Sequence, residues 1–103
     1  MYSIASYSKW HNVDADLEAI GASASLDVKT QFSTNTKYPR EVVGIWANAG
    51  ALQATTATLR CRTFGSNEVL NLVIPLNQFV AIPVRYIHKE GTNATGLHVI
   101  GEA

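Results

Sequence analysis

The residues of this sequence that could perform catalysis are a single cysteine and three histidines. Cys61 would act as a nucleophile only with a base beside it, and His88 or His98 could supply that base. The alternation along residues 57–62 puts Cys61 on the apolar side of its stretch, where a thiol packs as a small hydrophobic side chain. We therefore expect a buried structural cysteine and a protein that is not an enzyme.

The histidines could also bind a metal ion. His11, His88 and His98 lie far apart in the sequence, and no second cysteine can help to complete a tetrahedral set. Close ligand spacing is absent, so we expect surface or partly buried histidines. The sequence therefore predicts neither a metal site nor a cofactor.

A short acidic cluster near the start of the chain could form a carboxylate pair or a calcium site. Asp14, Asp16 and Glu18 alternate with other residues, but a calcium loop needs further oxygen ligands and a glycine at its turn. The apolar residues of 13–20 recur at helical spacing, and Gly21 suits a helix stop. Carboxylates favour the positive end of a helix dipole, so we expect the solvated start of a short helix. Eight residues are few for a helix, and a single turn or an irregular connection is the alternative.

The composition narrows the classes of partner. The chain has 103 residues, with 47% hydrophobic residues, 16% charged residues and a formal net charge of zero. This length is typical of one domain, and about 25% charged residues is usual, so the low value favours apolar surface that a partner covers. The 8 basic residues form no run, and we expect neither nucleic-acid nor membrane binding. The first residues lack the apolar segment of a signal peptide, so we expect synthesis in a cytoplasm.

Short apolar-alternating stretches dominate the rest of the chain. Clusters of turn-forming residues separate them roughly every 10 to 15 residues, which is typical of an all-β domain. We expect a small antiparallel β-sandwich or barrel, jelly-roll-like, with at most one short helix. The predicted strands are residues 22–33, 41–48, 51–64, 68–76, 79–88 and 95–101.

Local turn signals also predict some strand partners and faces. Asn48-Ala49-Gly50 favours a hairpin between strands 41–48 and 51–64. Gly44 would allow a bulge or close packing, and Pro75 and Pro83 favour strand ends, edges or bulges. In the strand 79–88, the two-residue period puts Val80, Ile82, Val84 and Tyr86 on one side.

The chain divides into residues 1–21, an N-terminal arm or short helix, and residues 22–103, a single β domain. Residues 2–11 fit either a first strand or an extended arm that docks on a neighbour. Exposed aromatic anchors are typical of interfaces, and the strand 68–76 is apolar on both faces. The residues expected at an interface are Tyr2, Ile4, Tyr7, Trp10, Val69 and Val73.

An alternative function is a carbohydrate-binding β-sandwich module. Trp46 and Tyr38 could stack on sugar rings, because aromatic faces pack well against them. A Trp46 in the core would not be available for this role.

An ordered set of segments in residues 41–101 carries a family resemblance. GIWANAG is followed by a Thr-rich strand and then by NLVIPLNQFVAIPVRYIHKEGTNATGLHVIG. The pair Pro83-Val84 precedes the turn Gly91-Thr92-Asn93-Ala94-Thr95-Gly96, which leads into one apolar strand. The pattern resembles small tailed-phage virion proteins of the head spike base and capsid decoration, or cement, type. The chain departs from it by Lys89-Glu90 before the turn glycine, and residues 1–21 do not align.

The resemblance implies a non-enzymatic structural protein of the virion. It implies a β-sandwich that assembles as a symmetric homo-oligomer, a trimer or a pentamer, on the capsid exterior. The partners would be the major capsid protein or other virion proteins. The protein would be made in the host cytoplasm and would stabilise the shell by burying apolar surface between subunits.

Overall fold

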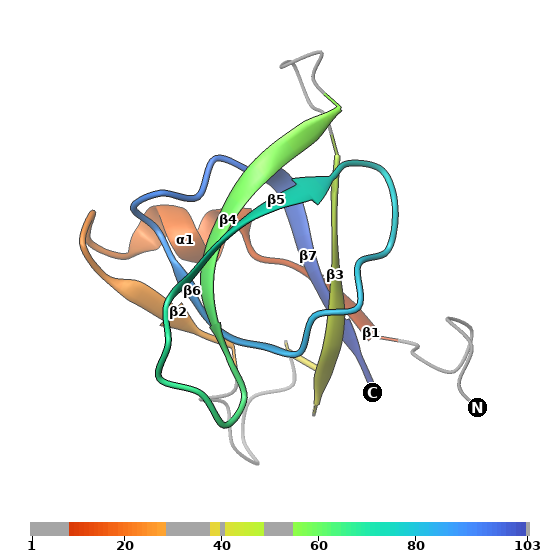
Figure 1. Cartoon of the computed structure of the whole chain (residues 1–103), viewed down its shortest axis with the longest axis horizontal. Helices are drawn as coiled ribbons and strands as arrows, with labels where there is room; N and C mark the ends of the chain where they lie inside the picture. Colours follow the sequence, from red (N-terminus) through yellow and green to blue (C-terminus); the bar gives the residue numbers. More distant parts are fainter. Residues whose placement is uncertain (1–8, 29–37, 40, 49–54, 103) are drawn as a thin grey trace.

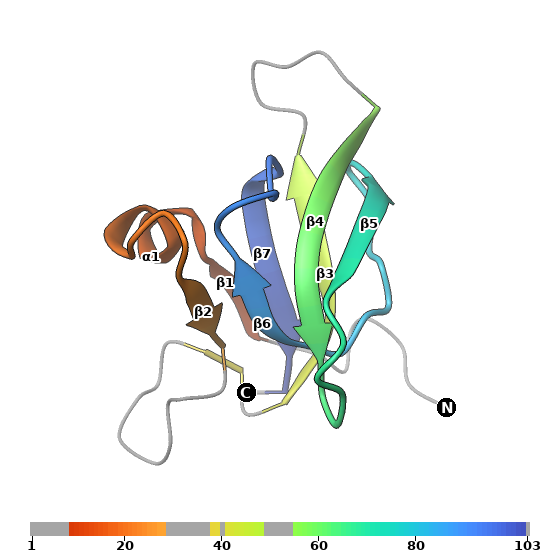
Figure 2. The same ribbon diagram turned by 60° about the vertical axis from the view of Figure 1, so that its left-hand side comes forward.

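The computed structural model describes residues 9–28, 38–39, 41–48 and 55–102, and in this part the chain forms a two-layer β-sandwich. One layer is a three-stranded sheet, the other is a four-stranded sheet, and all strand pairs are antiparallel. A helix, α1 (Asp14–Ala19), lies at one side of the sandwich (Figures 1 and 2). The predicted fold, a small antiparallel β-sandwich with one short helix, is confirmed.

Both sheets are assembled from strands that are distant in the sequence. The three-stranded sheet has the order β1 (Lys9–Asn12), β7 (Thr95–Gly101), β3 (Val42–Asn48). The four-stranded sheet has the order β2 (Ser25–Asp27), β6 (Val84–His88), β4 (Thr56–Thr63), β5 (Leu70–Pro75). The outer strands are therefore β1 and β3 in one sheet, and β2 and β5 in the other.

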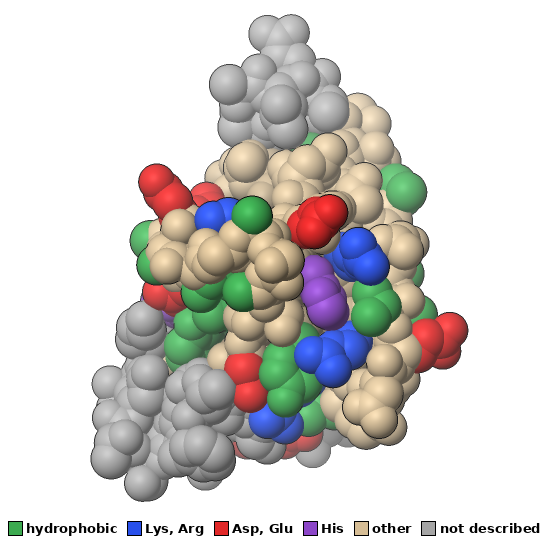
Figure 3. All heavy atoms as spheres, turned by 90° about the vertical axis from the view of Figure 1, so that its left-hand side faces the viewer, with side chains coloured by type: hydrophobic (Ala, Val, Ile, Leu, Met, Phe, Trp, Pro, Cys, Tyr) green, Lys and Arg blue, Asp and Glu red, His purple; other side chains and the backbone are tan. Residues whose placement is uncertain are grey.

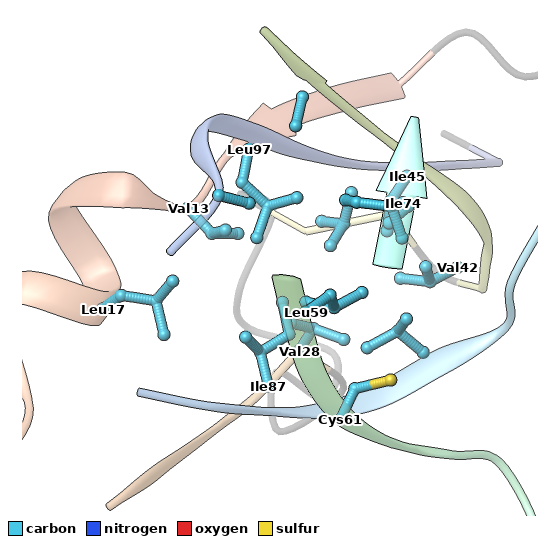
Figure 4. Packing of buried hydrophobic residues seen from close by; sticks show 14 of the residues in the cluster. Val13, Leu17, Val28, Val42, Ile45, Leu59, Cys61, Ile74, Ile87 and Leu97 are labelled. Atoms are coloured by element: carbon cyan, nitrogen blue, oxygen red, sulfur yellow. The ribbon is translucent and has the colours of Figure 1, made fainter. Parts of the chain in front are cut away.

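Alternating side chains from the two sheets fill the space between the layers (Figure 4). Leu97 and Val99 of β7 point inward as predicted, and Leu59 and Cys61 of β4 do so from the other sheet. All four side chains are 0% exposed. The two-residue period of β4 and β7 thus sends the intervening residues to the outer faces, where any interaction surface must lie.

The predicted hairpin between residues 41–48 and 51–64 is wrong. β3 pairs with β7, whereas β4 pairs with β5 and β6 in the opposite sheet. The two strands are consecutive in the sequence but belong to different layers. Both faces of β3 are apolar or aromatic, so its side-chain pattern did not specify which neighbour it joins.

The predicted strand 22–33 is much shorter in the structure. Only Ser25–Asp27 form β2, while a turn precedes it, with the Ala24 N–H donating to the Gly21 carbonyl at 3.0 Å. Val28 is fully buried, and residues 29–33 lie outside the described part. The alanines and serines before Leu26 bury little apolar area, so their alternation alone does not hold them in a sheet.

Residues 9–19 pack with the sandwich. β1 pairs with β7 along its whole length, and Trp10 lies opposite Ile100. The predicted helix forms as α1, and Leu17 packs into the core cluster.

Of the two interpretations of residues 2–11, the first strand is correct for residues 9–11. The expected interface residues Tyr2, Ile4 and Tyr7 lie outside the described residues.

Val80 covers part of the free edge of β3. The Ile45 N–H donates to the Val80 carbonyl and the Val80 N–H donates to the Ile45 carbonyl, both at 2.9 Å. Gly44 permits this approach, because a Cβ at that position would collide with the Phe79 ring. The predicted close packing at Gly44 is therefore present, and the β3 register shifts beside it.

The predicted face of the strand 79–88 is only partly correct. β6 begins at Val84, which is fully buried. Tyr86, expected beside Val84, lies instead opposite Arg62 on the outer face, because the pairing of β4 with β6 shifts between Arg62 and Thr63. A bulge of this kind moves every following side chain to the other face.

Candidate interaction surfaces

Neither His88 nor His98 lies beside the Cys61 side chain. Its side chain is 0% exposed and faces the core, and burial raises the pKa of its thiol. His88 follows the inward-facing Ile87 and therefore points to the outer side of the same sheet. His98 lies between the inward-facing Leu97 and Val99, on the outer side of the other sheet. The proposed Cys–His pairs do not form, and Cys61 packs as a small hydrophobic residue, as its alternation indicated.

The expected solvated helix start is correct for Glu18, which is exposed. It is wrong for Asp14 and Asp16, whose partly buried carboxylates bind to other elements. The Asp16 carboxylate accepts a hydrogen bond from the Tyr38 hydroxyl at 2.7 Å and lies 2.8 Å from Nε2 of His11. Burial and Asp16 together raise the pKa of Tyr38 well above its usual value. The Asp16 carboxylate therefore joins α1 to β1 and to the segment at Tyr38.

Asp14 joins α1 to the start of β7. Its two carboxylate oxygens accept hydrogen bonds from the backbone N–H groups of Gly96 at 2.8 Å and Leu97 at 3.1 Å. The Lys89 ammonium group donates to the Ile20 carbonyl at 2.9 Å, near the end of the helix. These contacts use the hydrogen-bonding capacity of both side chains to hold the helix.

An open pocket of about 320 Å³ lies beside α1. Its lining includes Asp14 and Lys89, whose charged groups are already engaged, together with apolar and hydroxyl side chains. The lining residues are Asp14, Leu17, Glu18, Lys89, Thr92, Ala94 and Thr95. The pocket therefore offers a ligand few convergent polar groups, which a specific site needs.

The described ranges contain no group of three or more His, Cys, Asp or Glu residues that could hold a metal ion. In that same part of the chain, no helix has the length and apolar character to cross a lipid bilayer.

The outer face of the three-stranded sheet carries an aromatic cluster with one ring from each strand. Ring centroids lie 6.2 Å apart for Trp10 and Trp46, 6.2 Å for Trp10 and His98, and 5.7 Å for Trp46 and His98. The register explains the cluster, because Trp46 lies opposite His98 on the outer face of the sheet. Trp10 is 43% exposed, so the cluster presents one open indole beside two half-buried rings.

Trp46 and Tyr38 are the two residues that we expected could stack on sugar rings, and of the two only Trp46 has a partly exposed side chain. Tyr38 is 6% exposed and its hydroxyl donates to Asp16, so its ring face is not available to a ligand. Trp46 is half-buried within the aromatic cluster.

β5 exposes two of the residues that the sequence indicated as interface residues. Val73 is 72% exposed and Val69, just before the strand, is 37% exposed. Asn71 lies between them on the same outward side and is also exposed. We call Val69, Asn71 and Val73 the β5 surface. With Trp10, its two valines are the large hydrophobic residues that the described part of the chain leaves exposed.

Basic residues that are scattered in the sequence gather on the outer face of the four-stranded sheet. Arg60 and Arg62 of β4 alternate with inward-facing residues, and Arg85 and His88 of β6 lie near them. Figure 3 views the molecule from the side of β2 and β6 and shows Lys and Arg side chains around a histidine. The spacing of Arg60 and Arg62 places them on one face, but only the register of β6 brings the other two residues close. The absence of a run of basic residues in the sequence therefore did not predict whether basic side chains gather on the folded surface.

Comparisons of the chain with protein families, with curated proteins and with solved structures gave no match.

Proposed function

We propose that the chain is a non-enzymatic structural protein that assembles as a symmetric homo-oligomer on the exterior of a phage capsid. It would act as a decoration, cement or head spike base protein and stabilise the shell. The capsid setting rests on the resemblance of residues 41–101 to small virion proteins. The assembly mechanism rests on the β5 surface.

The observation that carries this proposal is the edge strand β5, which has no charged side chain. In the described part of the chain β5 pairs with β4 alone, which leaves the backbone N–H and C=O groups of its other side without a strand partner there. Val73 at 72% exposure adds an apolar side chain to these groups. Proteins that remain monomeric usually cover such an edge or place charges on it, because it can pair with another chain. An edge of this kind favours a partner.

A second copy of the chain can cover the exposed apolar side chains of the β5 surface. Each 100 Å² of apolar surface buried stabilises the contact by about 2.5 kcal/mol before the cost of ordering the subunits is subtracted. If the β5 surface contacts a different surface of the next copy, repeating that contact closes a ring, such as the trimer or pentamer that the resemblance implies. Simultaneous contacts with a capsid lattice would add avidity to each weak contact.

The first test is the mass of the protein in solution, measured by light scattering after size exclusion over a wide concentration range. We expect one closed species of three or five chains, with a smaller species only on dilution. A single-chain mass at every concentration would contradict self-assembly.

The contribution of the N-terminal residues needs a deletion that spares β1. Removing residues 1–11 would delete part of a paired strand, so the informative variant lacks residues 2–8 only. If Tyr2, Ile4 and Tyr7 contact the shell, this variant should fold normally and bind capsids more weakly. Unchanged capsid affinity in a co-sedimentation assay would exclude that role.

The aromatic cluster supports one second candidate function, carbohydrate binding. Trp10 presents an open indole beside Trp46 and His98, and exposed indoles stack on sugar rings. Binding to a glycan array that is lost in Trp10→Ala and retained in Val73→Ala would support this function. Absence of glycan binding by the wild-type protein would remove it.

A further inference from the structure

Two arginines on the four-stranded sheet lack an acidic partner in the part of the chain that the structure describes. Arg60 and Arg62 form no ion pair there, and the Nε atom of each is buried without a hydrogen-bond acceptor. Arg85 on β6 provides a contrast, because its Nε and Nη2 atoms donate to the two oxygens of Asp27 at 2.8 and 3.1 Å. Among the described residues of this face, one arginine is therefore paired with a carboxylate and two arginines form no ion pair.

Neighbouring residues hold both unpaired arginines in place. The guanidinium carbon of Arg62 lies 4.1 Å from the centroid of the Tyr86 ring, a cation–π contact. The Arg60 backbone N–H donates to the Thr92 hydroxyl at 2.9 Å. The Arg60 side chain packs so closely on Gly91 that a Cβ there would come within 2.9 Å of Cδ. These contacts lower the entropy that each arginine would lose on binding a ligand.

His88 completes this group from β6. Cys61 lies opposite Ile87, so the same register places His88 beside Arg60 on the outer face. Nε2 of His88 is buried and has no hydrogen-bond partner. Burial, followed by the charges of Arg62 and Arg60, lowers the pKa of His88, which keeps the ring neutral at pH values near 7. The imidazole can therefore form a hydrogen bond without adding a third charge.

We propose that Arg60, Arg62 and His88 form a binding site for a doubly charged tetrahedral oxyanion, a phosphate monoester or inorganic phosphate or sulfate. Two guanidinium groups supply two positive charges and forked N–H donors, which suit a tetrahedral dianion. A carboxylate carries one negative charge and would leave one arginine uncompensated. The site goes beyond the assembly function and does not depend on it.

The test is a titration of the wild-type protein at constant ionic strength, followed by calorimetry and by the NMR signals of the His88 ring. The probes are inorganic phosphate, sulfate, glycerol phosphate and acetate. We expect saturable binding of the dianions, weakened about 10-fold or more in Arg60→Gln and in Arg62→Gln, because each loses charge-assisted hydrogen bonds. Tighter binding of glycerol phosphate than of phosphate would assign the site to esters, and the reverse order would assign it to the free ion.

Lys9→Gln is the matched control, because it removes one positive charge from β1 in the opposite sheet. It should leave the affinity for dianions unchanged within about two-fold. Arg60→Lys keeps the charge without the fork and should bind more weakly than wild type, which tests the site even if Arg60→Gln folds poorly. Absence of saturable binding, equal losses in Lys9→Gln and the two arginine variants, or acetate binding as tight as phosphate would each overturn the proposal.

Discussion

The two edges of the four-stranded sheet are built in opposite ways. β2 has three residues, and its Asp27 carboxylate forms a two-bond contact with Arg85 on the neighbouring strand. β5 has six residues, LNLVIP, without a charged side chain, and Val73 on it is 72% exposed. One edge is short and charged, while the other is longer, carries no charged side chain and exposes Val73.

This difference indicates where the sandwich can accept another chain. Short edge strands and charged side chains oppose pairing with a further strand, because a partner would have to desolvate the charge. β2 has both protections and β5 has neither. In the other sheet, Val80 already occupies part of the free edge of β3. The contrast between β2 and β5 is therefore the basis of the proposed assembly, and changing each edge in turn tests it.

Val73→Lys should have the largest effect. It places a charge at the most exposed valine of the β5 surface, and we expect association to weaken by about 10-fold or more, as at a well-packed interface position. The free energy of unfolding of the dilute monomer should change by no more than about 0.5 kcal/mol, because the side chain is exposed in the single chain. Light scattering measures the first quantity and urea denaturation the second.

Ala22→Lys is the control for this substitution, since it adds the same charge at an exposed turn before β2. Its oligomer should match that of the wild type. Retention of the full oligomer in Val73→Lys would show that β5 is not the contact.

Asp27→Asn should have a smaller effect, and on a different quantity. Arg85 loses its charged acceptor in a partly exposed pair, so the free energy of unfolding should fall by about 1 kcal/mol. The mass in solution should not change. Glu68→Gln, an exposed carboxylate just before β5, should leave stability within about 0.5 kcal/mol of wild type. A loss of the oligomer in Asp27→Asn would move the assembly contact to β2.

The smallest expected effect is on the pH dependence of stability, and it comes from His88 on β6, a strand that lies between the two edges. The pKa of His88 is lowered from its ordinary value of 6.5, so the unfolded chain binds a proton more readily than the folded protein. Arg62 and Arg60 face the ring from β4, and both remain charged throughout the titration. Stability is therefore full above pH 6.5 and falls as the pH drops from 6.5 through the lowered pKa.

His88→Gln should reduce this acid-dependent loss of stability, as measured by thermal melting from about pH 7.5 to about pH 5. His11 and His98 remain in both proteins, so their contributions cancel in the comparison. The same pH dependence in both proteins would show that His88 is not the responsible group.

The sequence predicted the class of fold and several strands, because these depend on local alternation. Thr95–Gly101 forms the strand expected at 95–101, and Val42–Asn48 fills most of 41–48. Strand partners were predicted less well, since the pairing of β3 with β7 joins residues about fifty positions apart and depends on how two apolar faces pack. The turn-forming sequence at 48–50 did not indicate that β3 and β4 lie in different sheets.

The surface features also divide into those that follow from local alternation and those that depend on distant strand pairing. Simple alternation placed Val69 and Val73 on one face of their strand; both valines are exposed, as is Trp10 on β1. Their role at an interface stays a prediction. The grouping of His88 with Arg60 and Arg62 depends on the register of β4 with β6, and the bonds of Asp14 and Asp16 depend on distant partners. No local pattern contains that information.

Amide hydrogen exchange of β5 and β2, measured over a range of protein concentrations, tests the central claim most directly. We expect the backbone N–H groups of β5 that point away from β4, which are those of alternate residues, to exchange more slowly as the protein becomes more concentrated, because a neighbouring copy covers them. The N–H groups of Ser25–Asp27 should exchange at the same rate at every concentration. Slower exchange in β2 with no change in β5, or a rising mass with no change in β5, would contradict the account.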